Sequence, residues 1–106
     1  MKTYKSMILV GLALVLAIPT IALAQGTGVD TFKAKCAMCH GADGSASTGM
    51  GKTMGLKPLG SPEVQKMSDA DLNALITNGK GKMPAMKGKL TDAQITDVVK
   101  YIRMLR

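Results

Sequence analysis

The sequence predicts a small all-α domain of three to four short helices. Helical spacing of apolar residues recurs in four segments between glycine-rich connectors, most clearly at 92–105, and no segment alternates as a strand would. The chain has 106 residues, which is enough for one domain at most. With 12 glycines and 3% aromatic residues the helices are short of core material, so we expect something else to supply it.

The N-terminal segment is expected to be a secretory signal peptide. A basic start precedes an apolar run from Met7 to Ile18, and the small residues before Gln25 suit signal cleavage after Ala24. This predicts a cleaved leader at 1–24 and a mature domain at 25–106. The alternative is an uncleaved N-terminal helix that anchors the chain, because 18 residues from Met7 to Ala24 reach the length of a membrane span.

The charge of the mature chain favours a protein partner over a nucleic acid. Two of the 14 basic residues leave with the leader, so 12 basic and 7 acidic side chains remain, a net charge of +5. The basic residues are scattered, and the chain lacks the aromatic side chains on which bases stack. A basic surface that steers toward an acidic protein fits this composition better.

Each expected helix begins after a residue that can cap it: 28–37 after Thr27, 62–67 after Ser61, 69–78 after Ser68 and 92–105 after Thr91. Asp30, Asp71 and Gln94 stand where a reciprocal capping box needs them. Residues 41–60 are expected to be a long, nearly structureless loop. Such a loop in a compact domain implies a function or a missing packing partner.

Both cysteines and the only histidine lie in the segment KCAMCHGADG, residues 35–44. A structural zinc site needs about four Cys or His ligands, and a dithiol oxidoreductase motif normally accompanies a βαβ pattern that is absent here. A simple loop disulfide leaves His40 unexplained. C-x-x-C-H denotes covalent haem attachment, in which Cys36 and Cys39 form thioethers and His40 is the proximal iron ligand. One covalent haem c would also supply the missing core.

The segment resembles the haem segment of class I cytochromes c, of the small bacterial and cytochrome c6-like kind. Gly28 and Phe32 match that family's first helix, and KMPAMKGKLTDAQITDVVKYIRML, residues 82–105, is similar to its methionine loop and final helix. The resemblance covers most of the mature chain. It implies a cytochrome c fold, with helices wrapped around the haem and the N- and C-terminal helices crossing so that Phe32 meets Tyr101.

The second axial ligand is expected to be a methionine, because the chain has no second histidine. Met83 and Met86 both lie in a loop between two helices, so their position alone leaves both open. The family pattern, a methionine followed by Pro-Ala, maps onto Met83 as the distal iron ligand. The resemblance also suggests a backbone carbonyl near Pro58 as the hydrogen-bond partner of His40.

We therefore expect a periplasmic or otherwise exported, soluble electron carrier, not an enzyme, with no stable membrane insertion. Its iron would transfer one electron under His/Met ligation. The alternatives are a haem-containing subunit of a complex, a peroxidase-like haem protein, or a thiol–disulfide oxidoreductase. Its partners would be redox proteins with acidic docking surfaces, facing lysines that flank the haem segments: Lys33, Lys35, Lys80, Lys82, Lys87 and Lys89.

Overall fold

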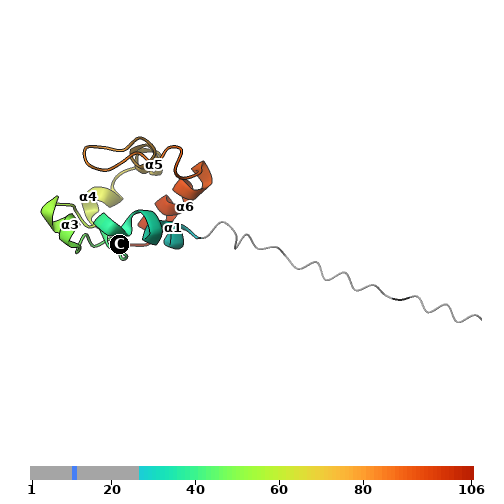
Figure 1. Ribbon diagram of the computed structural model, residues 1–106, viewed down its shortest axis with the longest axis horizontal. Coiled ribbons are helices and arrows are strands. Elements are labelled where there is room, and N and C mark those ends of the chain that lie inside the picture. Colours follow the sequence, from blue (N-terminus) through green and yellow to red (C-terminus); the bar gives the residue numbers. More distant parts are fainter. Residues whose placement is uncertain (1–10, 12–26) are drawn as a thin grey trace, which may run out of the picture.

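The computed structural model describes Gly11 and residues 27–106, so the predicted signal peptide, apart from Gly11, lies outside the described residues. All regular elements of residues 27–106 are helices: α1 (Gly28–Lys35), α2 (Ala37–His40), α3 (Gly49–Thr53), α4 (Pro62–Gln65), α5 (Asp69–Asn78) and α6 (Asp92–Arg103) (Figure 1). The predicted all-α class is thus confirmed for this part of the chain. No helix within it is long and apolar enough to cross a membrane.

The first and last helices start with the predicted capping boxes. At α1 the Thr27 hydroxyl accepts from the Asp30 N–H at 3.2 Å, and the Asp30 carboxylate accepts from the Thr27 N–H. At α6 Thr91 and Gln94 make the same reciprocal pair at 3.1 and 2.9 Å. These bonds satisfy N–H groups that have no partner within a helix, so both helix starts follow from local sequence.

The starts of the two middle helices differ from the prediction. Ser68 caps α5 by accepting from the Asp71 N–H at 3.0 Å, but the Ser68 N–H makes no return bond to the Asp71 carboxylate that would complete the box. Ser61 is the N-cap residue of α4, as predicted, but its side chain makes no cap bond and its hydroxyl oxygen is buried without a partner in the described part of the chain. Pro62 occupies the first turn, where its fixed φ suits a helix start.

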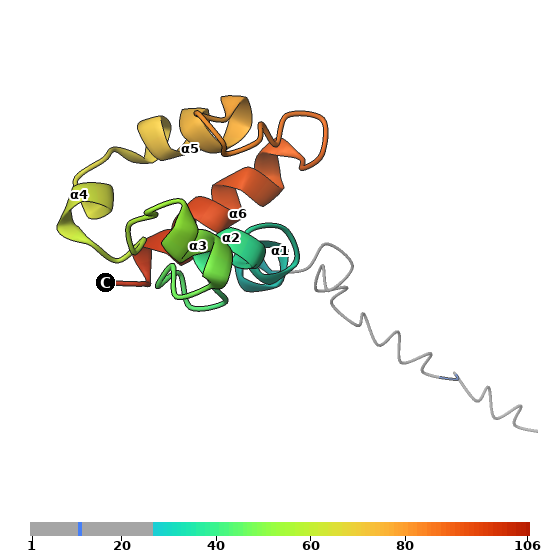
Figure 2. The same cartoon turned by 60° about the vertical axis from the view of Figure 1, so that its left-hand side comes forward.

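The crossing of α1 and α6 that the resemblance implied is confirmed (Figures 1 and 2). A Cβ on Gly28 would lie 2.7 Å from the carbonyl carbon of Asp97, so only glycine permits this approach of the two backbones. Beside it the rings of Phe32 and Tyr101 pack with centroids 5.0 Å apart at 60°. The Tyr101 hydroxyl also donates to the Ala42 carbonyl at 3.0 Å, which ties the chain after α2 to the last helix.

The apolar face of α6 is the centre of the core, and its inward residues are all buried: Ile95, Val98, Val99 and Ile102. Leu72 and Ile76 of α5 pack against this cluster from one side, and Phe32 of α1 from another. Figure 2 shows α1, α2 and α3 below α6, and α5 with the loop that follows it above. The two groups of elements therefore lie on different sides of the last helix.

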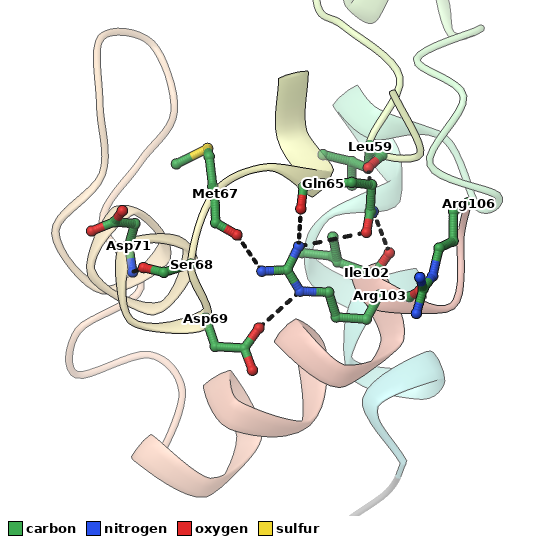
Figure 3. Close-up of polar contacts among 9 residues, drawn as sticks. All are labelled: Leu59, Gln65, Met67, Ser68, Asp69, Asp71, Ile102, Arg103 and Arg106. Atoms are coloured by element: carbon green, nitrogen blue, oxygen red, sulfur yellow. Dashed lines mark hydrogen bonds and ion pairs between the residues drawn. The ribbon is translucent and has the colours of Figure 1, made fainter. Parts of the chain in front are cut away.

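Arg103, at the end of α6, holds the segment that joins α4 to α5 (Figure 3). Its Nε donates to Asp69 Oδ1 at 2.8 Å, its Nη1 to the Gln65 carbonyl at 3.0 Å, and its Nη2 to the Met67 carbonyl. Gln65 Nε2 in turn donates to the Ile102 carbonyl at 2.9 Å. These bonds fix the start of α5 relative to α6.

Two further features depart from the predicted elements. The helix expected at 28–37 is interrupted at Cys36, which ends α1 and begins α2. The loop at 41–60, expected to be nearly structureless, contains α3. Its sequence, GMGKT, includes two glycines of poor helix propensity, so local pattern could not reveal a helix that depends on its contacts.

Candidate functional site

A largely apolar cavity of roughly 400 Å³ separates the two groups of elements. Its lining comes from residues 34–40 of α1 and α2, from Met54 and Leu56 after α3, and from the loop between α5 and α6. All four predicted site residues line it: Cys36, Cys39, His40 and Met83. The cavity falls within the size range of cofactor pockets and places these residues around one space.

The attachment turn, residues 36–40, brings the two cysteines and the histidine together on one helical turn. The N–H groups of Cys39 and His40 both bond to the Cys36 carbonyl, at 3.3 and 3.0 Å. All three side chains are half-buried. Met38, between the cysteines, also lines the cavity but is 76% exposed, so it lies at the mouth.

The thiol of Cys36 is not suited to act as a nucleophile. Burial and the neighbouring Cys39 raise its pKa to about 11, so the thiol is protonated at neutral pH. Reactive dithiols have the opposite property, a pKa below the ordinary value. The two cysteines form no disulfide with each other. This environment disfavours the thiol–disulfide alternative.

The imidazole of His40 is held neutral and has an unused nitrogen. Burial lowers its pKa, which favours the neutral form that binds metals. Its Nδ1 is buried without a hydrogen-bond partner in the described part of the chain. The Pro58 carbonyl, expected near it, accepts from the Ser61 N–H at 3.0 Å instead. The Phe32 ring, with its centroid 6.5 Å from that of the imidazole, packs beside it.

A second wall of the cavity was not expected from the sequence. We call residues 48–56 the α3 wall. After α3 the chain turns so that the Leu56 N–H bonds to the Gly51 carbonyl at 2.9 Å, and Met54 and Leu56 line the cavity. The sequence signal for this wall was that two methionines and a leucine, Met50, Met54 and Leu56, occur among otherwise small and polar residues.

Opposite the attachment turn lies the strap, residues 80–90. Within it Lys80 and Met83 exchange two backbone bonds of 3.1 and 2.9 Å, which form a tight turn. The N–H groups of Met86 and Lys87 bond to the carbonyls of Ile76 and Thr77, at 3.0 and 3.1 Å, and so attach the strap to the end of α5.

Both candidate methionines of the strap line the cavity, but they differ in burial. Met86 is 7% exposed and belongs to the core cluster around α6. Met83 is half-buried, packs only at the edge of that cluster, and precedes Pro84, which restricts its backbone to extended conformations. Met83 is therefore the methionine with less of a role in the core.

The six lysines expected near the site are all exposed, and none makes an ion pair within the described residues. Lys35, Lys80 and Lys82 line the cavity itself. They come from both the attachment side and the strap. A cluster of positive charge thus surrounds the mouth of the cavity, whereas Lys33, Lys87 and Lys89 do not line it.

The residues of the cavity fit the covalent haem that the motif predicts. Two thiols and a neutral imidazole with a buried, unpartnered nitrogen lie on one side, and thioethers lie on the other. The lining is mainly apolar, as a flat apolar macrocycle requires, and the protein core leaves this space unfilled.

Comparison with known proteins places the chain among haem proteins. The model of a family described as cytochrome C oxidase, cbb3-type, subunit III matches residues 24–102. A cytochrome c6 from Nostoc sp. is 34% identical over 96% of this chain and 92% of its own length. A cytochrome c6 from Leptolyngbya boryana is 40% identical over 71% of this chain and 85% of its own.

A solved structure is similar as well. The KustC0563 c-type cytochrome superposes with a TM-score of 0.70, at 29% identity, over 76% of this chain and 98% of its own. The match spans nearly all of that protein, so the described helices reproduce a complete domain rather than a fragment of one.

Proposed function

The chain belongs to the monohaem c-type cytochromes, cytochrome c6-like in kind, and we propose that it is an exported electron carrier whose iron is bound by His40 and Met83. Membership in this family makes it an electron carrier with one covalent haem c, not an enzyme. The proposal for the ligands rests on one observation: Cys36, Cys39, His40 and Met83 line a single apolar cavity.

The residues of the attachment turn would hold the cofactor. When bound, the haem supplies an iron that gains or loses one electron. Cys36 and Cys39 would tether it through two thioethers, and the neutral imidazole of His40 would bind the iron from the same side. The buried Nδ1 of His40 is then free to donate to an acceptor that fixes the ring orientation.

Met83 is the better candidate for the opposite side. A thioether there raises the reduction potential and keeps other ligands from the iron, which suits a carrier and not a peroxidase. Met83 is supported by its place on the cavity wall, its modest role in the core and the stiffening effect of Pro84. Met86 also lines the cavity, but its side chain is buried in the core cluster around α6.

Export and docking complete the proposal. Cleavage after Ala24 would release the domain at 25–106 into the periplasm or its equivalent. There the exposed Lys35, Lys80 and Lys82 around the cavity mouth would attract an acidic redox partner. Such attraction between exposed charges weakens with salt, because mobile ions screen it.

A second candidate is a haem-carrying subunit of a larger complex, and the description of the matching family model, an oxidase subunit, favours it. Fractionation of the native host distinguishes the two. A carrier is recovered in the soluble exported fraction at the size of one chain. A subunit is recovered with membranes and co-purifies with its complex.

The central experiment is expression with a cytochrome c maturation system, followed by intact mass and an absorption spectrum. We expect a mass equal to residues 25–106 plus one haem and no titratable thiol. We also expect the weak absorption band that methionine-ligated ferric haem shows at the long-wavelength end of the visible spectrum, called the red-end band below. Met83→Leu, which preserves volume but removes the thioether, should abolish the band, whereas the matched variant Met86→Leu should retain it. The opposite pattern would assign Met86, and a wild-type protein without the band would contradict His/Met ligation.

A further inference from the structure

One hydroxyl group connects the attachment turn to the α3 wall. The Thr48 Oγ1 donates to the Cys39 carbonyl at 2.8 Å and accepts from the Gly51 N–H at 2.8 Å. A hydroxyl has a single proton, and it is used in the first bond while a lone pair accepts the second. Thr48 is therefore at once the cap of α3 and a partner of the residue before His40.

The two elements that Thr48 joins are packed closely. A Cβ on Gly51 would lie 2.6 Å from the Cys39 carbonyl oxygen and 2.6 Å from that of Ala46, so α3 rests directly on the attachment turn. The Ala46 N–H bonds to the His40 carbonyl at 2.8 Å, and Ala46 has a left-handed φ of +60°. A non-glycine residue in this conformation indicates a loop whose shape is imposed by such contacts.

We propose that Thr48 is a positioning residue for the haem site. Its hydroxyl holds the α3 wall against the carbonyl end of the attachment turn, and so keeps Met54 and Leu56 over the cavity. Without it the Cys39 carbonyl and the Gly51 N–H each lose a partner, and water satisfies them most easily by entering between the two elements. The apolar shell around a redox centre sets its potential by limiting solvent access, so a loosened wall should lower the potential.

This inference rests on the proposed function, since it concerns the same haem. Thr48→Val removes the hydroxyl at nearly constant shape, and Thr48→Ser keeps it. Thr53→Val is a matched control, because the Thr53 hydroxyl donates at 2.8 Å to the Gly49 carbonyl inside α3 and Thr53 does not line the cavity. All three are to be made in the full chain and matured with haem.

In a redox titration Thr48→Val should shift the ratio of reduced to oxidised protein about threefold or more toward the oxidised form at a fixed potential. Exchange of the Gly51 amide hydrogen should accelerate about tenfold, because its acceptor is gone. Thr48→Ser and Thr53→Val should match the wild type in the titration. Equal potentials in Thr48→Val and wild type, or the same shift in Thr53→Val, would overturn the inference.

Two further outcomes remain informative. If Thr48→Val and Thr48→Ala accumulate without covalent haem, the yield of haem attachment replaces the redox titration as the measurement. A low yield in Thr48→Ser as well would then contradict a role for the hydroxyl. Failure of the proposed function has a different signature, since the wild-type protein itself would then lack the methionine–iron band. A wild type with the band and an unaltered Thr48→Val leaves the carrier intact and rejects only the role of Thr48.

Discussion

The attachment turn and the strap line the same cavity, but they are held in the molecule by different kinds of contact. The attachment side is held by the α1–α6 crossing, by the Tyr101–Ala42 bond and by Thr48. The strap, within the described residues, has two backbone bonds to the rest of the chain, both to the last turn of α5, and two buried side chains, Met86 and Leu90.

This difference has a consequence for stability. Segments with few buried contacts open at a lower free energy than the global unfolding of the domain. We expect the strap, and with it the proposed Met83 ligand, to detach while the covalently tethered side stays folded. The attachment side of the cavity should thus remain folded after the strap has opened. The following variants test that difference in local stability.

The largest effect is expected at the crossing that supports the attachment side. Gly28→Ala places a methyl group against the Asp97 backbone, which cannot move aside as a flexible side chain could. We expect about 3 kcal/mol of lost global stability, despite the better helix propensity of alanine. Denaturant unfolding followed by circular dichroism and by the red-end band should show both transitions moving together.

Gly49→Ala is the matched control, because a Cβ at Gly49 meets nothing within 4 Å and the residue also begins a helix. It should leave global stability unchanged or slightly higher. If Gly28→Ala were as stable as Gly49→Ala, the close approach of α1 and α6 would not support the attachment side.

A smaller and more local effect is expected just before the strap. Gly79 has φ +75° and ψ 171°, a region essentially restricted to glycine, and a Cβ there would lie 2.6 Å from the Met83 carbonyl oxygen. Gly79→Ala should cost about 2 kcal/mol in the strap. The red-end band should then disappear at lower denaturant than in the wild type, while the main unfolding transition shifts less.

Gly81→Ala separates conformational strain from the clash, since Gly81 also has a positive φ, +57°, but a Cβ there would meet nothing within 4 Å. Its effect on the band should be clearly weaker than that of Gly79→Ala. Equal movement of both transitions in Gly79→Ala would show that the strap is not an independently opening segment.

The smallest effect concerns the cavity mouth, where the two sides should behave alike. Lys35→Gln on the attachment side and Lys82→Gln on the strap each remove one unpaired positive charge. Oxidation by ferricyanide, a small anionic probe, should slow about twofold in each variant at low ionic strength, and this difference should vanish at high salt.

Lys100→Gln is the control, because Lys100 lies on α6, does not line this cavity and is 4.0 Å from Asp97. Its rate should equal that of the wild type. A rate independent of salt, or an equal slowing in all three variants, would argue against a localised docking surface at the cavity mouth.

The features that could be predicted from the sequence are those that depend on neighbouring residues along the chain. The capping boxes at Thr27 and Thr91 and the apolar stripe of α6 were predicted because they depend on residues three or four apart. The grouping of Cys36, Cys39 and His40 was predicted for the same reason. The missed helix α3 depends on its contacts with the attachment turn, which helical spacing within the segment does not reveal. Nothing in the described contacts explains why the Ser61 side chain makes no cap bond.

By itself, the sequence determined the all-α class, the starts of the main helices and the C-x-x-C-H turn, since each arises from short-range geometry along the backbone. The tertiary structure decided which glycines cannot be replaced, that Met54 and Leu56 join the cavity, and that Thr48 bridges two of its walls. Those outcomes depend on how closely α1, α3 and the strap approach other elements. That distance is set only when the whole chain packs around α6.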